Sequence, residues 1–446
     1  MLVRSANFMS FLKHIKVPTV KTQMTFGVSR NAGEFEWAGT SLSSVFAQRQ
    51  NLVKPSMWRL IFDIIRFNQF ALEILRRTEK CKNPSSTSEH GVRYEQRQES
   101  VGEYLEREGY SQTFRDNYLI PMTAAVWSTS PEKCSLEFPV VTLIRFMWNH
   151  HLLSTVSRRP DWLTVSGGAR QYIDAVLADV PDRQMHLETK VTALQPCKDG
   201  RVVLRSNKGE QVFDHVILAT HGDQALDIMS QAATPQERRV LGSFTTNRNV
   251  AVLHSDVSLM PRRRVAWSAW NYMTESPFPP TSKTSNIPKI CLTYCMNLLQ
   301  HLPEQKFGSV LVTLNPLSPI DPQLVQGIWE YAHPCYNAEA IAAQGLLSSI
   351  QNKRGISYCG AWTKYGFHED GFSSGLAVAM NHLGATLPFE FVDSTFSRGG
   401  QPTMTMADQV GRIVLLIIQL LILVMEAIHG QAWEALDRQI SVLRKQ

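Results

Sequence analysis

Residues 356–362 read ISYCGAW, and residues 366–377 read GFHEDGFSSGLA. The first stretch is typical of a short buried strand that ends in a Gly-Ala turn, and the second predicts a helix that begins at Gly371. A helix start exposes backbone N–H groups and the positive end of the helix dipole, and small residues there let a ligand approach the backbone. The pattern favours the pyrophosphate and pyrimidine edge of a dinucleotide such as FAD. The same glycines would also permit ordinary packing of a helix on a sheet, so both interpretations stay open.

A second informative segment runs from residue 185 to residue 221. Asp199-Gly200 separates two strand-like runs and predicts a β-hairpin, because both central residues of a type I′ turn need a positive φ. Residues 216–219 read VILA, a continuous apolar run that is expected of a strand buried on both faces. The run leads into Thr220 and His221, and open α/β sheets bind ligands at such carboxyl ends of strands.

These two segments resemble the flavin-containing amine oxidase-like superfamily. Further stretches narrow the likeness to the predicted NAD/FAD-binding flavoproteins whose plant relatives are fused to cyclopropane fatty acid synthases: MTFGVS from residue 24, EWAG from residue 36, WLTVSGG from residue 162 and YGFHEDG from residue 365. The resemblance implies an α/β fold, with a FAD/NAD(P)-binding domain of the glutathione-reductase type and an α+β substrate domain inserted discontinuously. It also implies an oxidoreductase that uses FAD.

The resemblance assigns residues to the cofactor site as well. In that family the strand that begins at Val191 passes the adenine of FAD, and the strand end that follows residue 218 lies near the cofactor. The Gly-Ala turn approaches the pyrophosphate, and the start of the next helix meets the flavin ring. The implied cofactor-binding residues are Val191, Ala219, Thr220, Gly360, Ala361, Gly371, Phe372 and Ser373.

The chain also departs from the family. Family members begin with a βαβ unit that carries Gly-x-Gly-x-x-Gly, whose glycines bring the backbone to the pyrophosphate. No Gly-x-Gly occurs in this sequence, and its first 23 residues resemble a point well inside the family. We therefore expect an N-terminally incomplete FAD-binding domain, and we expect this chain alone to hold FAD weakly or not at all.

The chemistry of a flavin needs little help from side chains, because the cofactor itself transfers the hydride or electrons. Amine oxidases often carry Tyr where this chain has Phe372, so the aromatic wall is kept, the hydroxyl is lost, and a simple amine substrate is disfavoured. His368 is the one catalytic candidate, because an imidazole can move protons near neutral pH. It could equally cap the helix. The aromatic residues Trp127, Trp267, Trp270 and Tyr365 line an apolar pocket in one interpretation and belong to the core in the other.

Composition limits the classes of function. The chain has 446 residues, 43% hydrophobic and 19% charged, with a net charge of +6. These are values of a globular protein, and no nucleic-acid-binding motif accompanies the modest positive charge. Its seven cysteines form no Cys-x-x-Cys pair and no metal-ligand spacing, which predicts reduced thiols in an intracellular protein without a metal site. A small-molecule substrate is the expected partner.

One segment could touch a membrane. Residues 413–425 are apolar except for Gln419. Such a helix would be about 20 Å long, against about 30 Å for a hydrocarbon core. The alternatives are a helix packed on the protein body, an interfacial or C-terminal anchor, and a tilted span. We expect any membrane contact to run through residues 411–428.

Apolar residues recur near helical spacing over 55–77 and predict a helix there, and a surface loop, 83–98, is expected in the same mainly helical part of the substrate domain. Strands are predicted at 250–254, 265–272, 290–294 and 310–314. A helix is expected to begin near Ser130, and residues 275–288 are expected to form a loop between strands. The predicted division is 1–165 for the helical substrate-domain part, 166–245 for a FAD-binding segment, 246–345 for an antiparallel substrate-domain sheet, 346–392 for the FAD-binding return segment, and 393–446 for a tail.

Two functions compete at this stage. The first is a FAD-dependent oxidoreductase that acts on an apolar, lipid-like substrate; the lipid is suggested by the fusion of relatives to cyclopropane synthases. The second is a non-catalytic, flavin-deficient remnant that acts as a membrane-associated or protein-binding module, suggested by the missing Gly-x-Gly unit.

Overall fold

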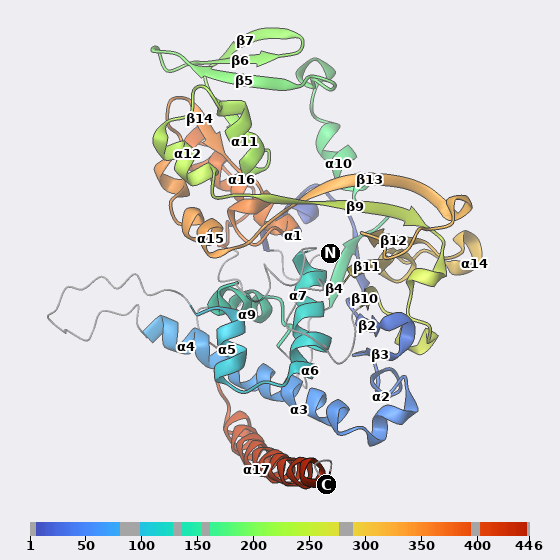
Figure 1. Cartoon of the computed structure of the whole chain (residues 1–446). Helices are drawn as coiled ribbons and strands as arrows, with labels where there is room; N and C mark the ends of the chain where they lie inside the picture. Colours follow the sequence, from blue (N-terminus) through green and yellow to red (C-terminus); the bar gives the residue numbers. More distant parts are fainter. Residues whose placement is uncertain are drawn as a thin grey trace, which may run out of the picture.

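The computed structural model describes residues 6–80, 99–127, 136, 138–153, 161–275, 289–393 and 402–443, with side chains in the last helix described as far as residue 428. The predicted loop 83–98, the helix start near Ser130 and most of the predicted loop 275–288 lie outside the described residues. The described part is a mixed α/β structure in which the strands form four separate sheets (Figure 1).

The largest sheet has the strand order β13-β9-β12-β11-β10-β2-β3. Its neighbours are antiparallel except for β10 and β2, which run parallel. Three of the four strands predicted within 246–315 form where expected. The run predicted at 265–272 is a strand only from Trp270, because residues 264–266 form a 3-10 helical turn. The strands are β2 (Phe26–Arg30), β3 (Phe35–Ala38), β9 (Thr246–His254), β10 (Trp270–Glu275), β11 (Lys289–Cys295), β12 (Leu311–Leu314) and β13 (Val325–Pro334).

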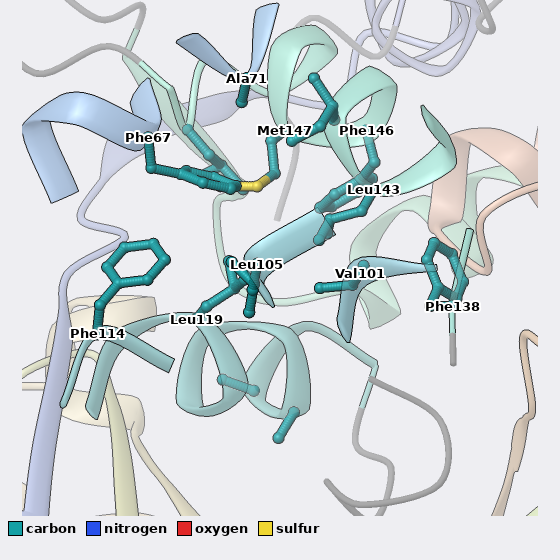
Figure 2. Close-up of a cluster of buried hydrophobic side chains, with 14 of the residues drawn as sticks. Phe67, Ala71, Val101, Leu105, Phe114, Leu119, Phe138, Leu143, Phe146 and Met147 are labelled. Atoms are coloured by element: carbon teal, nitrogen blue, oxygen red, sulfur yellow. The ribbon is translucent and has the colours of Figure 1, made fainter. Parts of the chain in front are cut away.

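Helices pack against this sheet to form the first hydrophobic core. The apolar pattern of residues 55–77 gives two helices rather than one, because the helix is interrupted at Ala71. Figure 2 shows side chains from several helices converging there, with Phe67, Leu143 and Met147 among them. The helices are α3 (Pro55–Phe70), α4 (Leu72–Lys80), α5 (Val101–Arg107), α7 (Ile120–Trp127) and α9 (Val140–Asn149).

A second core lies around a pair of parallel strands, β8 (Val216–Leu218) and β14 (Ile356–Tyr358). An antiparallel meander of β5 (Val191–Pro196), β6 (Val202–Ser206) and β7 (Gly209–Phe213) forms a separate sheet nearby (Figure 1). The predicted hairpin at Asp199-Gly200 joins β5 to β6, and Gly200 has a φ of 91°. The helices of this region are α11 (Gly222–Met229), α12 (Pro235–Leu241) and α15 (Ala338–Gln344).

The prediction that residues 216–219 are buried on both faces is wrong. Leu218 packs into the second core, but Ile217 points to the opposite face and is 40% exposed. Successive side chains of a strand point to opposite faces, so burial on both faces needs a packed layer on each side. In the described part of the chain only the Leu218 face has such a layer over this strand.

The C-terminal helix α17 (Met406–Leu443) lies along α3 at one end of the molecule (Figure 1). Side-chain contacts to α3 and α4 hold it there. The Arg59 guanidinium pairs with the Glu426 carboxylate at 2.9 Å, and the Arg412 guanidinium lies 3.5 Å from the Glu73 carboxylate and 4.5 Å from the centre of the Phe70 ring. Most of its apolar side chains are exposed, Leu416 and Leu420 among them.

Candidate cofactor site and apolar cavity

The two informative stretches, residues 216–221 and residues 356–362, lie side by side. Strands β8 and β14 pair in parallel, so that Tyr358 aligns with Leu218, and the Cys359 amide donates to the Leu218 carbonyl at 3.1 Å. Beyond the strands, the indole Nε1 of Trp362 donates to the Thr220 carbonyl at 2.8 Å. The Gly-Ala turn and the exit of β8 are therefore fixed to each other by hydrogen bonds.

The helix after this turn, α16 (His368–Leu383), begins three residues earlier than predicted. The Asp370 carboxylate accepts the Phe367 amide at 3.0 Å, and this cap draws His368 and the next two residues into the helix. The amide of Gly371 consequently donates to the Phe367 carbonyl instead of facing a ligand. Burial raises the pKa of Asp370 to about 6.

Two glycines lie where the helix and the turn meet. A Cβ at Gly371 would lie 3.4 Å from the Ala361 nitrogen, an ordinary van der Waals distance, so the helix start packs directly against the turn. Gly360 has a φ of 149°, and a Cβ there would lie 2.5 Å from the Trp362 indole nitrogen. The packing interpretation of these glycines is therefore satisfied, whatever ligand the site takes.

An open surface lies farther along the same helix. A Cβ at Gly375 would meet nothing within 4 Å, and Ala219 at the end of β8 is exposed. Ser374, one residue before this opening, bonds through its hydroxyl to the Gly360 amide at 2.9 Å. Gly375 and Ala219 are thus both accessible, and small residues of this kind let a ligand such as a dinucleotide approach the backbone.

Phe372 lies on a different face of the helix, against α1 (Ala6–His14). Its ring centre is 4.8 Å from that of Phe11 and 5.3 Å from that of Phe8. His368 also lies here, where its Nε2 is 2.9 Å from the Tyr172 hydroxyl. Desolvation lowers the pKa of His368, which keeps the imidazole neutral at physiological pH.

Glu369 is a site residue that the sequence prediction missed. Its buried carboxylate accepts the backbone amides of Asn7 at 3.1 Å and Phe8 at 3.0 Å, and so caps α1. It also accepts the Ser373 hydroxyl at 2.9 Å. Because the Ser373 hydroxyl is bonded to Glu369, Ser373 faces α1 and not the open surface at Gly375. The acidic first turn of the helix was the signal available in the sequence.

Val191 begins β5 and packs against the second core, on the meander rather than on the parallel strands. The predicted cofactor residues thus fall into three groups. Residues at the strand exits border one another, Phe372 and Ser373 face α1, and Val191 stands on a separate sheet.

A cavity of about 740 Å³ lies between α3 and the large sheet, and none of the predicted cofactor residues lines it. Among the described residues that line it, none is charged. The lining side chains are largely apolar and aromatic: Met24, Phe26, Trp37, Leu42, Val45, Phe46, Met57, Trp58, Leu60, Ile61, Ile64, Ile65, Tyr118, Met122, Val126, Leu152 and Trp270, together with Gln23, Thr25, Gly39, Thr40 and Asn68. The volume is typical of a small-molecule site.

Helix α7 connects the cavity to the start of α16. Val126 lines the cavity, and its neighbour Trp127 donates from Nε1 to the Tyr365 carbonyl at 3.1 Å. Trp127 and Tyr365 pack with the first core, whereas Trp270 lines the cavity. The aromatic residues singled out in the sequence therefore divide between core and pocket.

Known proteins agree with this architecture. The model of the flavin containing amine oxidoreductases matches residues 71–297. No curated protein matches the chain. A putrescine oxidase variant has a similar structure, with a TM-score of 0.54, 12% identity, and coverage of 85% of this chain and 86% of its own.

Two further structures share the fold. A putative protoporphyrinogen oxidase from Exiguobacterium sp. 255-15 has a TM-score of 0.51 at 13% identity, over 86% of each chain. A fatty acid isomerase from P. acnes that produces CLA has a TM-score of 0.50 at 11% identity, over 84% of each chain. Since the family match covers just over half of the 446 residues, the chain belongs to the flavin-containing amine oxidoreductase family.

Proposed function

We propose that the chain is a FAD-dependent oxidoreductase that acts on an apolar, lipid-like substrate. The observation that carries this proposal is a large cavity lined by uncharged, mostly apolar side chains, in a chain of the flavin-containing amine oxidoreductase family. The family indicates the class of chemistry, and the uncharged lining of the cavity indicates an apolar substrate. The fatty acid isomerase shares the fold alone, so it adds no evidence on the substrate.

In this proposal the exits of β8 and β14 hold the dinucleotide. Ala219 and Thr220 would border it from one strand, and Gly360 and Ala361 from the other, with the face of α16 around Gly375 beneath it. Bound FAD would supply hydride or electron acceptance. The chain's own part is to position the substrate in the cavity and to exclude water there.

The proposed division into a FAD-binding part and a substrate part follows the two hydrophobic cores. The first core draws on residues before 154 and on the large sheet, and the second on residues 194–244 and 340–362. We keep the five predicted segments, with the FAD-binding part formed by 166–245 and 346–392.

We also propose that α17 contacts a membrane. Within the described part, Met406–Ile428 is a segment of 23 residues at the start of α17, and its most apolar window has a mean hydropathy of 2.3 and is 6% buried. At 1.5 Å per residue the segment is about 35 Å long, against about 30 Å for a hydrocarbon core. It carries Asp408, Arg412 and Glu426 beside the apolar residues 413–425, and its exposure disfavours the helix packed on the protein body.

Flavin binding tests the proposal directly. The full chain is purified in detergent, mixed with FAD, separated from free cofactor and examined for visible flavin absorbance. Gly375→Leu fills the open surface and should abolish whatever binding the parent shows. Gly411→Leu is the matched control, because this glycine is also helical with nothing near its Cβ position. A parent chain that stays colourless at saturating FAD, or a Gly375→Leu variant that binds as the parent does, contradicts the proposed site.

A second function is favoured by one observation. Phe372, which the family resemblance assigned to the flavin ring, has its ring against Phe8 and Phe11. If those contacts persist, the chain is a flavin-free module that uses the cavity and α17 for binding alone. A colourless parent chain that still binds lipid is the result expected of this alternative.

A further inference from the structure

The polar side chains of α17 lie on the side of the helix that faces the protein. Between residues 410 and 428 they are Arg412, Gln419 and Glu426, which follow one another at intervals of seven and so form a polar stripe on one face. Arg412 and Gln419 are half-buried, and Glu426 is paired with Arg59 of α3. A surface helix of a water-soluble protein has the opposite arrangement, with its apolar face inward and its polar face outward.

The rest of the surface of α17 is apolar and exposed. The exposed fractions of its large apolar side chains run from 38% at Ile418 to 63% at Leu420. Only Leu415 and Ile422, which adjoin the polar stripe, are half-buried among them. A single partner helix covers a narrow seam of such a surface, as in a coiled coil. Lipid chains cover a helix from every open side, so a bilayer fits this surface better than one partner helix does.

Both ends of the apolar stretch of α17 contact the same part of the protein. Arg412, at its start, lies 3.5 Å from the Glu73 carboxylate of α4 and 4.5 Å from the centre of the Phe70 ring. Glu426, at its end, lies 2.9 Å from the Arg59 guanidinium. These two residues of α17 are about 21 Å apart along a helix. The helix therefore runs antiparallel to α3 and beside it over the whole stretch.

We infer that α17 lies in the plane of one leaflet of a lipid bilayer, with its polar stripe on α3 and its apolar side among the lipid chains, and does not cross the bilayer. A crossing helix that kept both contacts would draw α3 into the hydrocarbon core. That helix carries Arg59, Asp63 and Arg66, and charged side chains are costly there. This inference rests on the proposed membrane contact and specifies its geometry.

Photocrosslinking at paired positions tests this geometry. The full chain is synthesised cell-free in the presence of sealed vesicles of phosphatidylcholine and phosphatidylserine, with p-benzoylphenylalanine at one position of α17. Ile417 and Val424 are 55% and 48% exposed on the side away from the polar stripe, and a benzophenone there should crosslink to lipid. At Leu415 and Ile422, on the half-buried side, it should crosslink severalfold less lipid and instead react with α3 or α4 of the same chain. Leu187, which is 79% exposed on a turn, is the control that should give no lipid crosslink.

Protease access provides a second measurement that needs no substitution. A tag at the N-terminus and a tag after Gln446 should both be removed by protease added outside the vesicles. Equal lipid crosslinking at all four positions of α17, or a protected C-terminal tag, would show a spanning helix and overturn the inference while keeping the membrane contact. Crosslinks from Ile417 and Val424 only to a second copy of the chain would overturn lipid as the occupant. A chain that does not float with the vesicles refutes the membrane contact itself, and no outcome depends on FAD.

Discussion

Adjacent carboxylates at the start of α16 have different roles because their partners differ. Glu369 is met by two backbone amides and a hydroxyl, and it joins α1 to α16. Asp370 turns to its own helix and caps Phe367. For Asp370, desolvation outweighs the backbone amides of Phe367 and Tyr365, and its pKa rises to about 6.

This shift predicts a pH dependence of stability. The pKa of Asp370 is higher in the folded chain than in the unfolded chain, so its favourable contribution is complete below about pH 4 and is lost as the pH rises through 6. We expect the unfolding free energy to fall by about 2–3 kcal/mol across that window, since a pKa change of one equals 1.36 kcal/mol. Urea denaturation of the parent and of Asp370→Asn should give curves that converge at low pH and diverge above pH 6. Parallel curves would show that another group carries the dependence.

Glu369 is expected to matter more for stability than its surface counterparts. Glu369→Ala leaves two buried amides of α1 without acceptors, which should cost about 2–4 kcal/mol. Glu210→Ala is the control, because Glu210 is 58% exposed and its ion pair with Arg205 is worth little. Denaturant unfolding without FAD measures both. A Glu369 variant as stable as the control would mean that water replaces the carboxylate at α1.

At the scale of the elements, the sequence predicted most features that depend only on residues close together along the chain. The Asp199-Gly200 hairpin, the strands within 246–315 and the helical residues 55–77 all followed from turn chemistry and periodicity. The start of α16 did not, because the cap depends on where Asp370 points. The exposure of Ile217 and the position of the cavity beside α3 also escaped prediction. Each depends on which distant elements pack on a strand or helix, and a single sequence does not specify that.

The C-terminal helix gives a prediction at this scale. Leu416→Asp combined with Leu420→Asp places two charges on exposed positions of α17, and each carboxylate at the centre of a bilayer costs about 2.5–3.5 kcal/mol. The doubly substituted chain should move from the membrane fraction to the soluble fraction. Leu187→Asp is the control, because Leu187 is 79% exposed on a turn far along the sequence from α17. Identical fractionation of parent and double variant would contradict membrane contact.

At the scale of the whole molecule, the first and second hydrophobic cores are expected to be protected by different ligands. 1-Dodecanol, used as a lipid-like probe of the cavity, should slow amide hydrogen exchange in α3, β2 and β10, which border the cavity. FAD should instead protect β8, β14 and α16. Separate patterns would support the proposed division into substrate and FAD-binding parts. Uniform protection by either ligand would show that the cores respond as one unit.

The hydrogen bonds from the start of α1 to Glu369 also affect when this part of the chain can fold during synthesis. The hydrogen bond from Asn7 to Glu369 joins positions 362 residues apart. At a synthesis rate of roughly 5–20 residues per second, the acceptor emerges from the ribosome roughly 20–70 s after its donor. Throughout that interval Phe8 and Phe11 lack Phe372, and the helix that carries them lacks its cap. Residues 6–14 therefore reach their native packing only after α16 has been synthesised.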